Sequence, residues 1–244
     1  MKFQGKTVIV TGAAVGLGKA VAIQMAAKGA NVVLVDRNEE TLLSAKAQIS
    51  QQEQIMIYAC DVTDPEGALA CVAAARERFG KVDILVNNAG IWRCWGSFLD
   101  TSLEDWHQFM NVNVMGMVHF TKAALPDMLE QGWGRIVNVA SVAGVYGNAN
   151  MVHYSATKGA VISMTKALAK EVADRGITVN SISPGMVNSS KDPDIDATVP
   201  NGASYIGRTG SARENADLIC FLASDQAAFI SGQNILIDGC RKSI

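Results

Sequence analysis

The sequence predicts a doubly wound α/β fold, with about seven parallel strands in one sheet and helices on both of its faces, in a single domain spanning residues 1–244. Short, almost continuous apolar runs alternate with longer segments of helical periodicity from one end of the chain to the other. A glycine-rich turn follows the first apolar run, and no internal repeat divides the chain. Because parallel strands need crossover connections and are then covered on both faces, this alternation indicates three layers, α/β/α.

Each strand is expected where a short run of β-branched residues ends in turn residues. The first run, KTVIVT, covers residues 6–11 and leads directly into the glycine-rich turn. The remaining runs cover residues 31–36, 55–61, 82–90, 134–141, 177–183 and 234–238.

Helices are expected between these runs, where capping residues precede segments of helical period. Asn38 caps a helix that extends to about residue 50, and Asp64 followed by Pro65 begins the next one. The other helices are expected at residues 17–28, about 103–129, 151–174 and about 213–224.

One polar segment, residues 186–207, has neither the helical nor the strand period. A loop of this length inside a compact domain is usually functional. We therefore expect a substrate lid, with plain disorder as the alternative.

The bulk composition argues against several classes of function. A net charge of −2 and a pI of about 5.9 are unfavourable for binding nucleic acid. No window approaches the ~20 apolar residues of a membrane span, and the N-terminus does not resemble a signal peptide, so a cytoplasmic location is expected. The cysteines form no CxxC pair, which indicates reduced thiols and no metal site: Cys60, Cys71, Cys94, Cys220 and Cys240.

The turn after the first strand, VTGAAVGLGKA, has the features of a dinucleotide site. Gly12, Gly16 and Gly18 let the backbone turn tightly and approach a pyrophosphate at the positive N-terminus of the next helix. Asp36 ends the second strand, where a carboxylate accepts hydrogen bonds from the adenosine ribose and repels a 2′-phosphate. We therefore expect a Rossmann-type fold that binds NAD. NADP is the less favoured alternative, because Arg37 could pair with a 2′-phosphate.

Tyr154 and Lys158 form a candidate catalytic pair. They are four residues apart in a predicted helix and so share one face, among small residues that leave room for a ligand. A cation beside a phenol stabilises the phenolate. Beside Lys158 and a bound nicotinamide cation, we therefore expect the pKa of Tyr154 to be lowered far enough for proton exchange near neutral pH. The alternative is an interface tyrosine beside a solvated lysine.

Six motifs occur together in the order and spacing of one family. TGAAVGLG, NNAG at 87–90, NVN at 111–113, Ser141, YSATK and SPG at 183–185 resemble the short-chain dehydrogenase/reductase family, single-domain type, over the whole chain. The resemblance implies an NAD(P)-dependent oxidoreductase that interconverts a secondary alcohol and a ketone.

The resemblance also implies a role for each matching residue. Tyr154 would be the acid/base, and Ser141 would bind the substrate oxygen. Lys158 would bind the nicotinamide ribose, and Asn113 would hold a water of the proton relay. The implied cofactor-binding residues are Gly12, Gly16, Leu17, Gly18, Asp36, Arg37, Asp61, Val62, Asn88, Ala89, Gly90, Tyr154, Lys158, Pro184, Gly185, Val187 and Ser189.

The substrate side of the site is less clearly marked. Aromatic side chains that follow NNAG or flank the catalytic residues are candidates for an apolar pocket, which would suit a ring-bearing or otherwise apolar alcohol or ketone. These candidates are Trp92, Trp95, Tyr146, His153 and Tyr205.

Two other functions remain open. The second half of the chain is similar to the 3-oxoacyl-(acyl-carrier-protein) reductases, which use NADPH. Arg175 matches one of their carrier-binding basic positions, but Gly132 stands at the other. A non-catalytic NAD(H)-sensing regulator would be expected to lack the catalytic tyrosine, lysine or serine, all of which are present. The family resemblance also implies a homotetramer assembled through the long helices.

Overall fold

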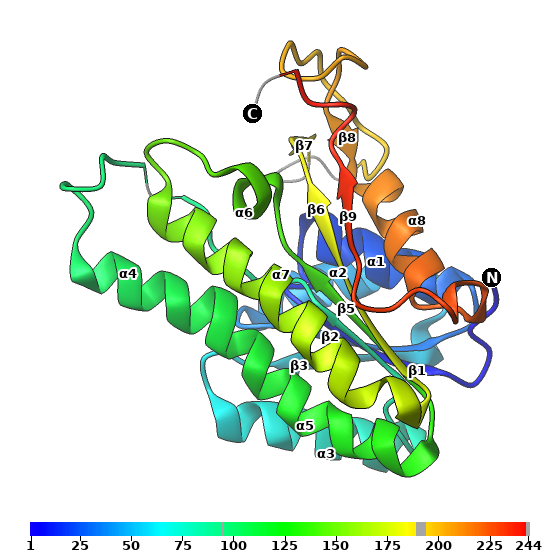
Figure 1. The fold of residues 1–244 in the computed structure, drawn as a ribbon. Helices are drawn as coiled ribbons and strands as arrows, with labels where there is room; N and C mark the ends of the chain where they lie inside the picture. Colours follow the sequence, from blue (N-terminus) through cyan, green and yellow to red (C-terminus); the bar gives the residue numbers. More distant parts are fainter. Residues whose placement is uncertain (94, 189–193, 243–244) are drawn as a thin grey trace.

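Seven parallel strands form one sheet in the order β3-β2-β1-β4-β5-β6-β9 (Figure 1). This computed structural model describes residues 1–93, 95–188 and 194–242. The predicted doubly wound sheet is confirmed, and its strands are β1 (Thr7–Thr11), β2 (Asn31–Asp36), β3 (Ile55–Ala59), β4 (Ile84–Asn87), β5 (Gly134–Val139), β6 (Ile177–Pro184) and β9 (Asn234–Ile237).

Helices cover both faces of the sheet. The first face is covered by α1 (Gly16–Ala27), α2 (Glu39–Ala47) and α8 (Ala212–Leu222). The second face is covered by α3 (Pro65–Phe79), α5 (Gly116–Gln131) and α7 (Val152–Val172).

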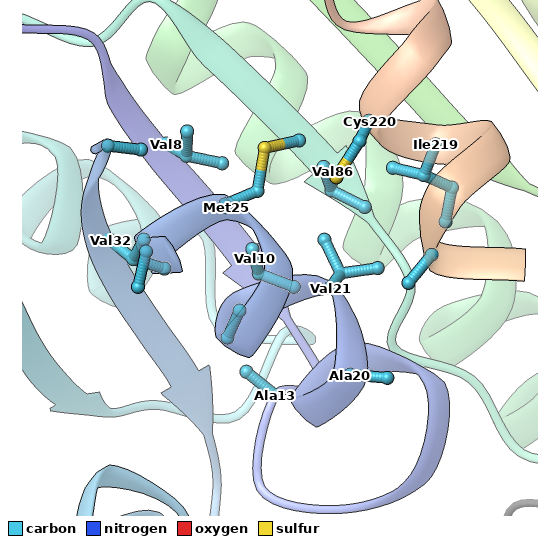
Figure 2. Close-up of a cluster of buried hydrophobic side chains, with 14 of the residues drawn as sticks. Val8, Val10, Ala13, Ala20, Val21, Met25, Val32, Val86, Ile219 and Cys220 are labelled. Carbon is cyan, nitrogen blue, oxygen red and sulfur yellow. The ribbon is translucent and has the colours of Figure 1, made fainter. Parts of the chain in front are cut away.

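The alternation of side chains along β1 produces the two cores. Val8 and Val10 belong to the core under α1 and α8, whereas Ile9 belongs to the core on the opposite face. Figure 2 shows Met25 of α1 and Ile219 of α8 in the first core. Because β1 is buried on both faces, its sequence is a continuous apolar run with no polar alternation.

The strand order reverses at β1, and this reversal positions the functional site. β2 pairs with one edge of β1 and β4 with the other, and all of these pairs are parallel. The connections that leave the carboxyl ends of β1 and β4 therefore diverge to opposite faces of the sheet. Such a divergence opens a crevice that binds ligands in sheets of this kind.

Several elements differ from the sequence prediction. The single helix expected at 103–129 is α4 (Leu103–Met110) and α5, separated by a π-helical turn at Asn111–Met115. The strand expected at 82–90 ends at Asn87, so most of the NNAG motif forms a loop. A short helix, α6 (Val142–Tyr146), and a two-stranded parallel pair, β7 (Val187–Asn188) with β8 (Gly210–Ser211), were not predicted.

The segment predicted as a lid is described only in part, because residues 189–193 lie outside the described residues. Its later portion is bound to the C-terminal segment, since the N–H of Tyr205 donates to the Cys240 carbonyl at 2.8 Å and that of Ile206 to the Gly239 carbonyl at 3.2 Å. Cys240 has a φ of 58°, in the left-handed region that favours glycine. The role of residues 186–207 as a lid stays a prediction.

Candidate active site

A cleft of about 750 Å³ lies at the carboxyl ends of the strands. Its volume is within the range of ~300–1,000 Å³ that is typical of ligand sites. Almost all of the predicted cofactor-binding residues line it: Gly12, Gly16, Leu17, Asp36, Arg37, Asp61, Val62, Asn88, Ala89, Gly90, Tyr154, Lys158, Pro184, Gly185 and Val187. Gly18 does not line the cleft, and Ser189 lies outside the described residues.

The turn between β1 and α1 offers backbone rather than side chains to the cleft. Gly12 has a φ of 64° and Gly16 a φ of 56°, which residues with a Cβ rarely adopt. Gly18 is required for packing: a Cβ there would lie 2.1 Å from the Gly12 carbonyl oxygen. The turn therefore fits a pyrophosphate at the N-terminus of α1.

The NNAG loop fixes this turn from the neighbouring strand. The Asn88 side chain donates to the carbonyls of Thr11 and Gly12 at 2.9 and 3.0 Å. In return, the Thr11 hydroxyl accepts the N–H groups of Asn88 and Ala89 at 3.0 and 3.1 Å. These bonds join the two divergent connections, so the motif shapes the floor of the crevice.

The carboxylates of Asp36 and Asp61 lie at the carboxyl ends of β2 and β3, at the end of the cleft away from α7, which carries Tyr154 and Lys158. Asp36 is half-buried and accepts the Ala14 N–H of the glycine-rich turn at 3.4 Å. The backbone N–H and hydroxyl of Thr63 donate to Asp61, and together with the nearby positive charge of Arg37 they lower the pKa of its carboxyl. Both carboxylates are thus suited to accept hydrogen bonds from ribose or base donors.

The candidate acid/base and its partners meet at the end of β5. Ser141 follows that strand, where its hydroxyl caps α6 by accepting the Ala143 N–H at 3.1 Å, and it also hydrogen-bonds the Tyr154 side chain. Lys158 is buried and donates to the Val139 carbonyl at 2.8 Å. Its ammonium nitrogen is 5.9 Å from the centre of the Tyr154 ring.

Burial shifts the pKa values of both members of the catalytic pair. Burial raises the pKa of Tyr154, and the hydrogen bond with Ser141 opposes this shift only in part. Burial also lowers the pKa of Lys158 to about 8. Without a bound dinucleotide, the cost of burying a phenolate outweighs its stabilising contacts. The lowered pKa expected beside Lys158 and a bound nicotinamide cation stays a prediction.

Asn113 lies in the π-helical turn behind the cleft wall. Its Oδ1 accepts the Ile91 N–H at 2.8 Å, and its Nδ2 donates to the Ile91 carbonyl at 3.0 Å and to the Thr157 hydroxyl at 3.1 Å. Thr157 in turn donates to the Tyr154 carbonyl at 2.8 Å. Asn113 therefore ties the loop after β4 to the catalytic helix.

A small second cavity, of about 10 Å³, lies beside Asn113. This volume is close to the minimum for a single water molecule. Lys158 and Asn87 also line it, and the buried Oδ1 of Asn87 has no protein hydrogen-bond partner among the described residues. The cavity thus has the size and polarity that a relay water at this position requires.

Only one of the five aromatic substrate candidates lines the cleft, and it is Trp92. Trp95 and Tyr205 are 67% and 70% exposed on other surfaces, and Tyr146 is partly buried on α6. His153 is fully buried, with its ring centre 4.2 Å from that of Phe109. The expected pocket of aromatic side chains is therefore not formed by these residues.

One wall of the cleft was not predicted from the sequence. Four of its residues lie in α4 and the following turn and share one helical face, at a spacing of three or four, and this spacing is the signal that could have identified them. Two further residues of the wall follow the NNAG motif. These residues are Asp105, Gln108, Phe109, Val112, Ile91 and Arg93.

In the described part of the chain, no helix is long and apolar enough to cross a bilayer. No group of three or more His, Cys, Asp or Glu side chains in the same residues could hold a metal ion.

Comparison with known proteins identifies the family. The model of the short chain dehydrogenase family matches residues 6–199. The chain belongs to this family. It is 39% identical over 243 residues to the 3-oxoacyl-(acyl-carrier-protein) reductase of Thermotoga maritima, with 98% of each chain covered. The protein is therefore an oxidoreductase of a family that binds NAD(P).

Solved structures of family members have the same fold. Levodione reductase superposes with a TM-score of 0.90 and 31% identity, covering 98% of both chains. NAD+-bound xylitol dehydrogenase superposes with a TM-score of 0.88 and 33% identity, covering 97% of this chain and 99% of that one.

Proposed function

We propose that this short-chain dehydrogenase interconverts a secondary alcohol and a ketone with NAD(H), using Tyr154 as the acid/base. The observation that supports this proposal is that Tyr154, Ser141 and Lys158 line the same cleft as the glycine-rich turn and Asp36. NADH, held by the glycine-rich turn and Asp36, would supply the hydride for reduction of the carbonyl carbon. The test is NADH oxidation with a panel of ketones, and no turnover of any ketone with either NADH or NADPH would contradict the proposal.

The protein residues handle the proton. Ser141 and Tyr154 hold the carbonyl oxygen, and Tyr154 gives its phenolic proton to that oxygen as hydride reaches the carbon. Lys158 and a water in the cavity beside Asn113 then return a proton to the phenolate. In the oxidative direction Tyr154 removes the hydroxyl proton and the relay carries it outward.

Support for NAD over NADP comes from the end of β2. Asp36 is half-buried and lies in the cleft wall, where its charge would repel a 2′-phosphate. Val15, in the glycine-rich turn, supplies no positive charge to offset that repulsion. Arg37 is exposed and its charge acts on Asp61.

Asp36→Ala is expected to raise the ratio of kcat/KM with NADPH to kcat/KM with NADH by about tenfold or more. The substitution removes the repulsion of the NADPH 2′-phosphate and also the hydrogen bonds to the NADH ribose. Steady-state kinetics with both cofactors measure the ratio. Glu39→Ala, which removes a carboxylate of α2 outside the cleft, is the control and should leave it unchanged. An unaltered ratio in Asp36→Ala would contradict this assignment.

A second candidate function is the NADPH-dependent reduction of a 3-oxoacyl group on a carrier protein. It is favoured by the relative from Thermotoga maritima, whose name states the reduction of a 3-oxoacyl group on a carrier protein and gives no cofactor. Arg175 is exposed, next to Gly176, and a Cβ on Gly176 would lie 2.2 Å from the Gly132 carbonyl oxygen. The two carrier positions are therefore adjacent, but only Arg175 is charged. Faster turnover of a 3-oxoacyl carrier protein than of small ketones would favour this function.

Assembly into a homotetramer through the long helices is also proposed. It is a family expectation for the long helices, which include α7 with the catalytic pair, and light scattering of the purified protein would measure it.

A further inference from the structure

The substrate end of the cleft contains a cation that is not paired with a carboxylate. We infer that the preferred substrates of this oxidoreductase carry an anionic group, a carboxylate or a phosphate, that binds Arg93. This inference rests on the proposed alcohol/ketone activity and names the class of its substrates.

The position of Arg93 follows from the loop after β4. Ile91 is held at both its N–H and its carbonyl by Asn113, which is bonded to Thr157 of the catalytic helix. Arg93 is two residues further on, so its backbone lies within about 7 Å of this anchored point. It lines the cleft together with Gln108 and Phe109 of α4, and the Phe109 ring centre is 6.4 Å from that of Tyr154. Arg93 is therefore placed at the catalytic end of the cleft.

The charge of Arg93 is available to a ligand. None of the ion pairs among the described residues includes Arg93. The acidic residue of the α4 wall, Asp105, uses its Oδ2 to accept the N–H and hydroxyl of Ser102 at 2.9 and 2.6 Å, as the cap of that helix. The other cations of the cleft differ from Arg93, because Lys158 donates to a carbonyl and Arg37 acts on Asp61.

Trp92 orients the guanidinium group. The Arg93 guanidinium carbon lies 5.1 Å from the centre of the Trp92 ring, within the range of a cation–π contact. A guanidinium over an aromatic face keeps its in-plane N–H donors for a planar acceptor, and a carboxylate or phosphate accepts two of them at once. The Gln108 amide in the same wall adds a further polar contact.

These residues change the expected substrate. A wall of Arg93, Gln108 and Asp105 is polar, whereas the sequence predicted an apolar pocket of aromatic rings. Arg93 is exposed, so a neutral hydrocarbon ketone would gain no charge-assisted hydrogen bond from its guanidinium. An oxo acid or a phosphorylated ketone would pair with it.

The test compares pairs of ketones in which one member carries the anionic group and the other does not. Pyruvate, 3-oxobutanoate and 4-oxopentanoate are each assayed with NADH beside their methyl esters, and dihydroxyacetone phosphate is assayed beside dihydroxyacetone. The expected result is a kcat/KM at least about tenfold higher for one acid or for the phosphate than for its neutral partner, or about 1.4 kcal/mol. The pair that shows the difference identifies the anion as a carboxylate or a phosphate.

Variants assign this preference to Arg93. Arg93→Met should lower kcat/KM for the preferred anion about tenfold while the neutral partner changes by no more than about twofold, and Arg93→Lys should retain part of the preference. The control is Arg78→Met, because Arg78 also lies over a ring, that of Phe79 at 5.2 Å, but is outside the cleft. Fluorescence titration of NADH should give the same affinity for all three variants.

Three outcomes would overturn the inference. The first is no preference for any charged substrate in the wild-type protein. The second is an equal loss of activity on charged and neutral substrates in Arg93→Met. The third is weaker NADH binding in that variant, which would assign Arg93 to the cofactor. Failure to reduce any ketone at all would instead contradict the proposed function.

Discussion

Tyr154→Phe is expected to lower kcat for ketone reduction by about 10²–10⁴-fold, the usual contribution of a general acid. The substitution removes only the phenolic hydroxyl, and with it the group that gives its proton to the substrate oxygen. The ring still packs near Phe109, and the dinucleotide contacts of the glycine-rich turn are unchanged. Steady-state kinetics with NADH measure the loss.

The affinity for NADH separates this role from a structural one. Fluorescence titration of Tyr154→Phe should give a Kd close to that of the wild-type protein. Tyr58→Phe removes a hydroxyl from β3 outside the cleft and is the matched control. If Tyr154→Phe retained most of its activity, the assignment of the acid/base would be wrong.

Gly18→Ala is expected to lower the free energy of unfolding by about 3 kcal/mol, the upper end of the cost of overpacking. The added methyl would lie 2.1 Å from the Gly12 oxygen and 2.6 Å from the Asn88 amide, so α1 has to move away from the turn. This movement also displaces Gly12 and Gly16, and NADH binding should weaken with stability. Denaturant unfolding followed by circular dichroism measures the change.

The control for this variant is another glycine replacement. A Cβ on Gly202 would meet no atom within 4 Å, and the φ of Gly202 is not in the left-handed region, so Gly202→Ala should leave stability nearly unchanged. Wild-type stability and NADH affinity in Gly18→Ala would show that the close approach of α1 to the turn is not required.

Most of the fold follows from local patterns in the sequence. The run at 31–36 coincides with β2 because it is bounded by turn residues on both sides. The strand expected at 82–90 was too long, because the ladder with β5 ends at Asn87 and the Asn88 side chain bonds instead to the carbonyls of Thr11 and Gly12. The π-helical turn at Asn111–Met115 has no period that distinguishes it from α-helix, so the sequence could not reveal it.

The candidate site was predictable where helical geometry fixes it, and less so elsewhere. Tyr154 and Lys158 share a face because they are one turn apart, whereas His153, a single residue earlier, is rotated by about 100° into the core against Phe109. Trp95 and Tyr205 lie in loops, where no period indicates direction. Arg93 was missed because an isolated polar residue in a loop has no pattern that separates a cleft wall from solvent.

Proton exchange by Tyr154 depends on its pKa when the dinucleotide is bound. The protein groups alone raise this pKa, because burial outweighs the hydrogen bond from Ser141. Lys158 remains largely protonated below its pKa of about 8. The positively charged nicotinamide of NAD+ adds a second favourable charge when bound, and opposite charges near a phenol lower its pKa.

The most direct test is an ultraviolet difference titration of the Tyr154 phenol, taken as wild type minus Tyr154→Phe, with and without saturating NAD+. We expect phenolate to form above the ordinary tyrosine pKa of about 10 in the free protein and clearly below it in the NAD+ complex. A pKa that stays raised in the complex would contradict the account, because Tyr154 could then not accept a proton from an alcohol near neutral pH.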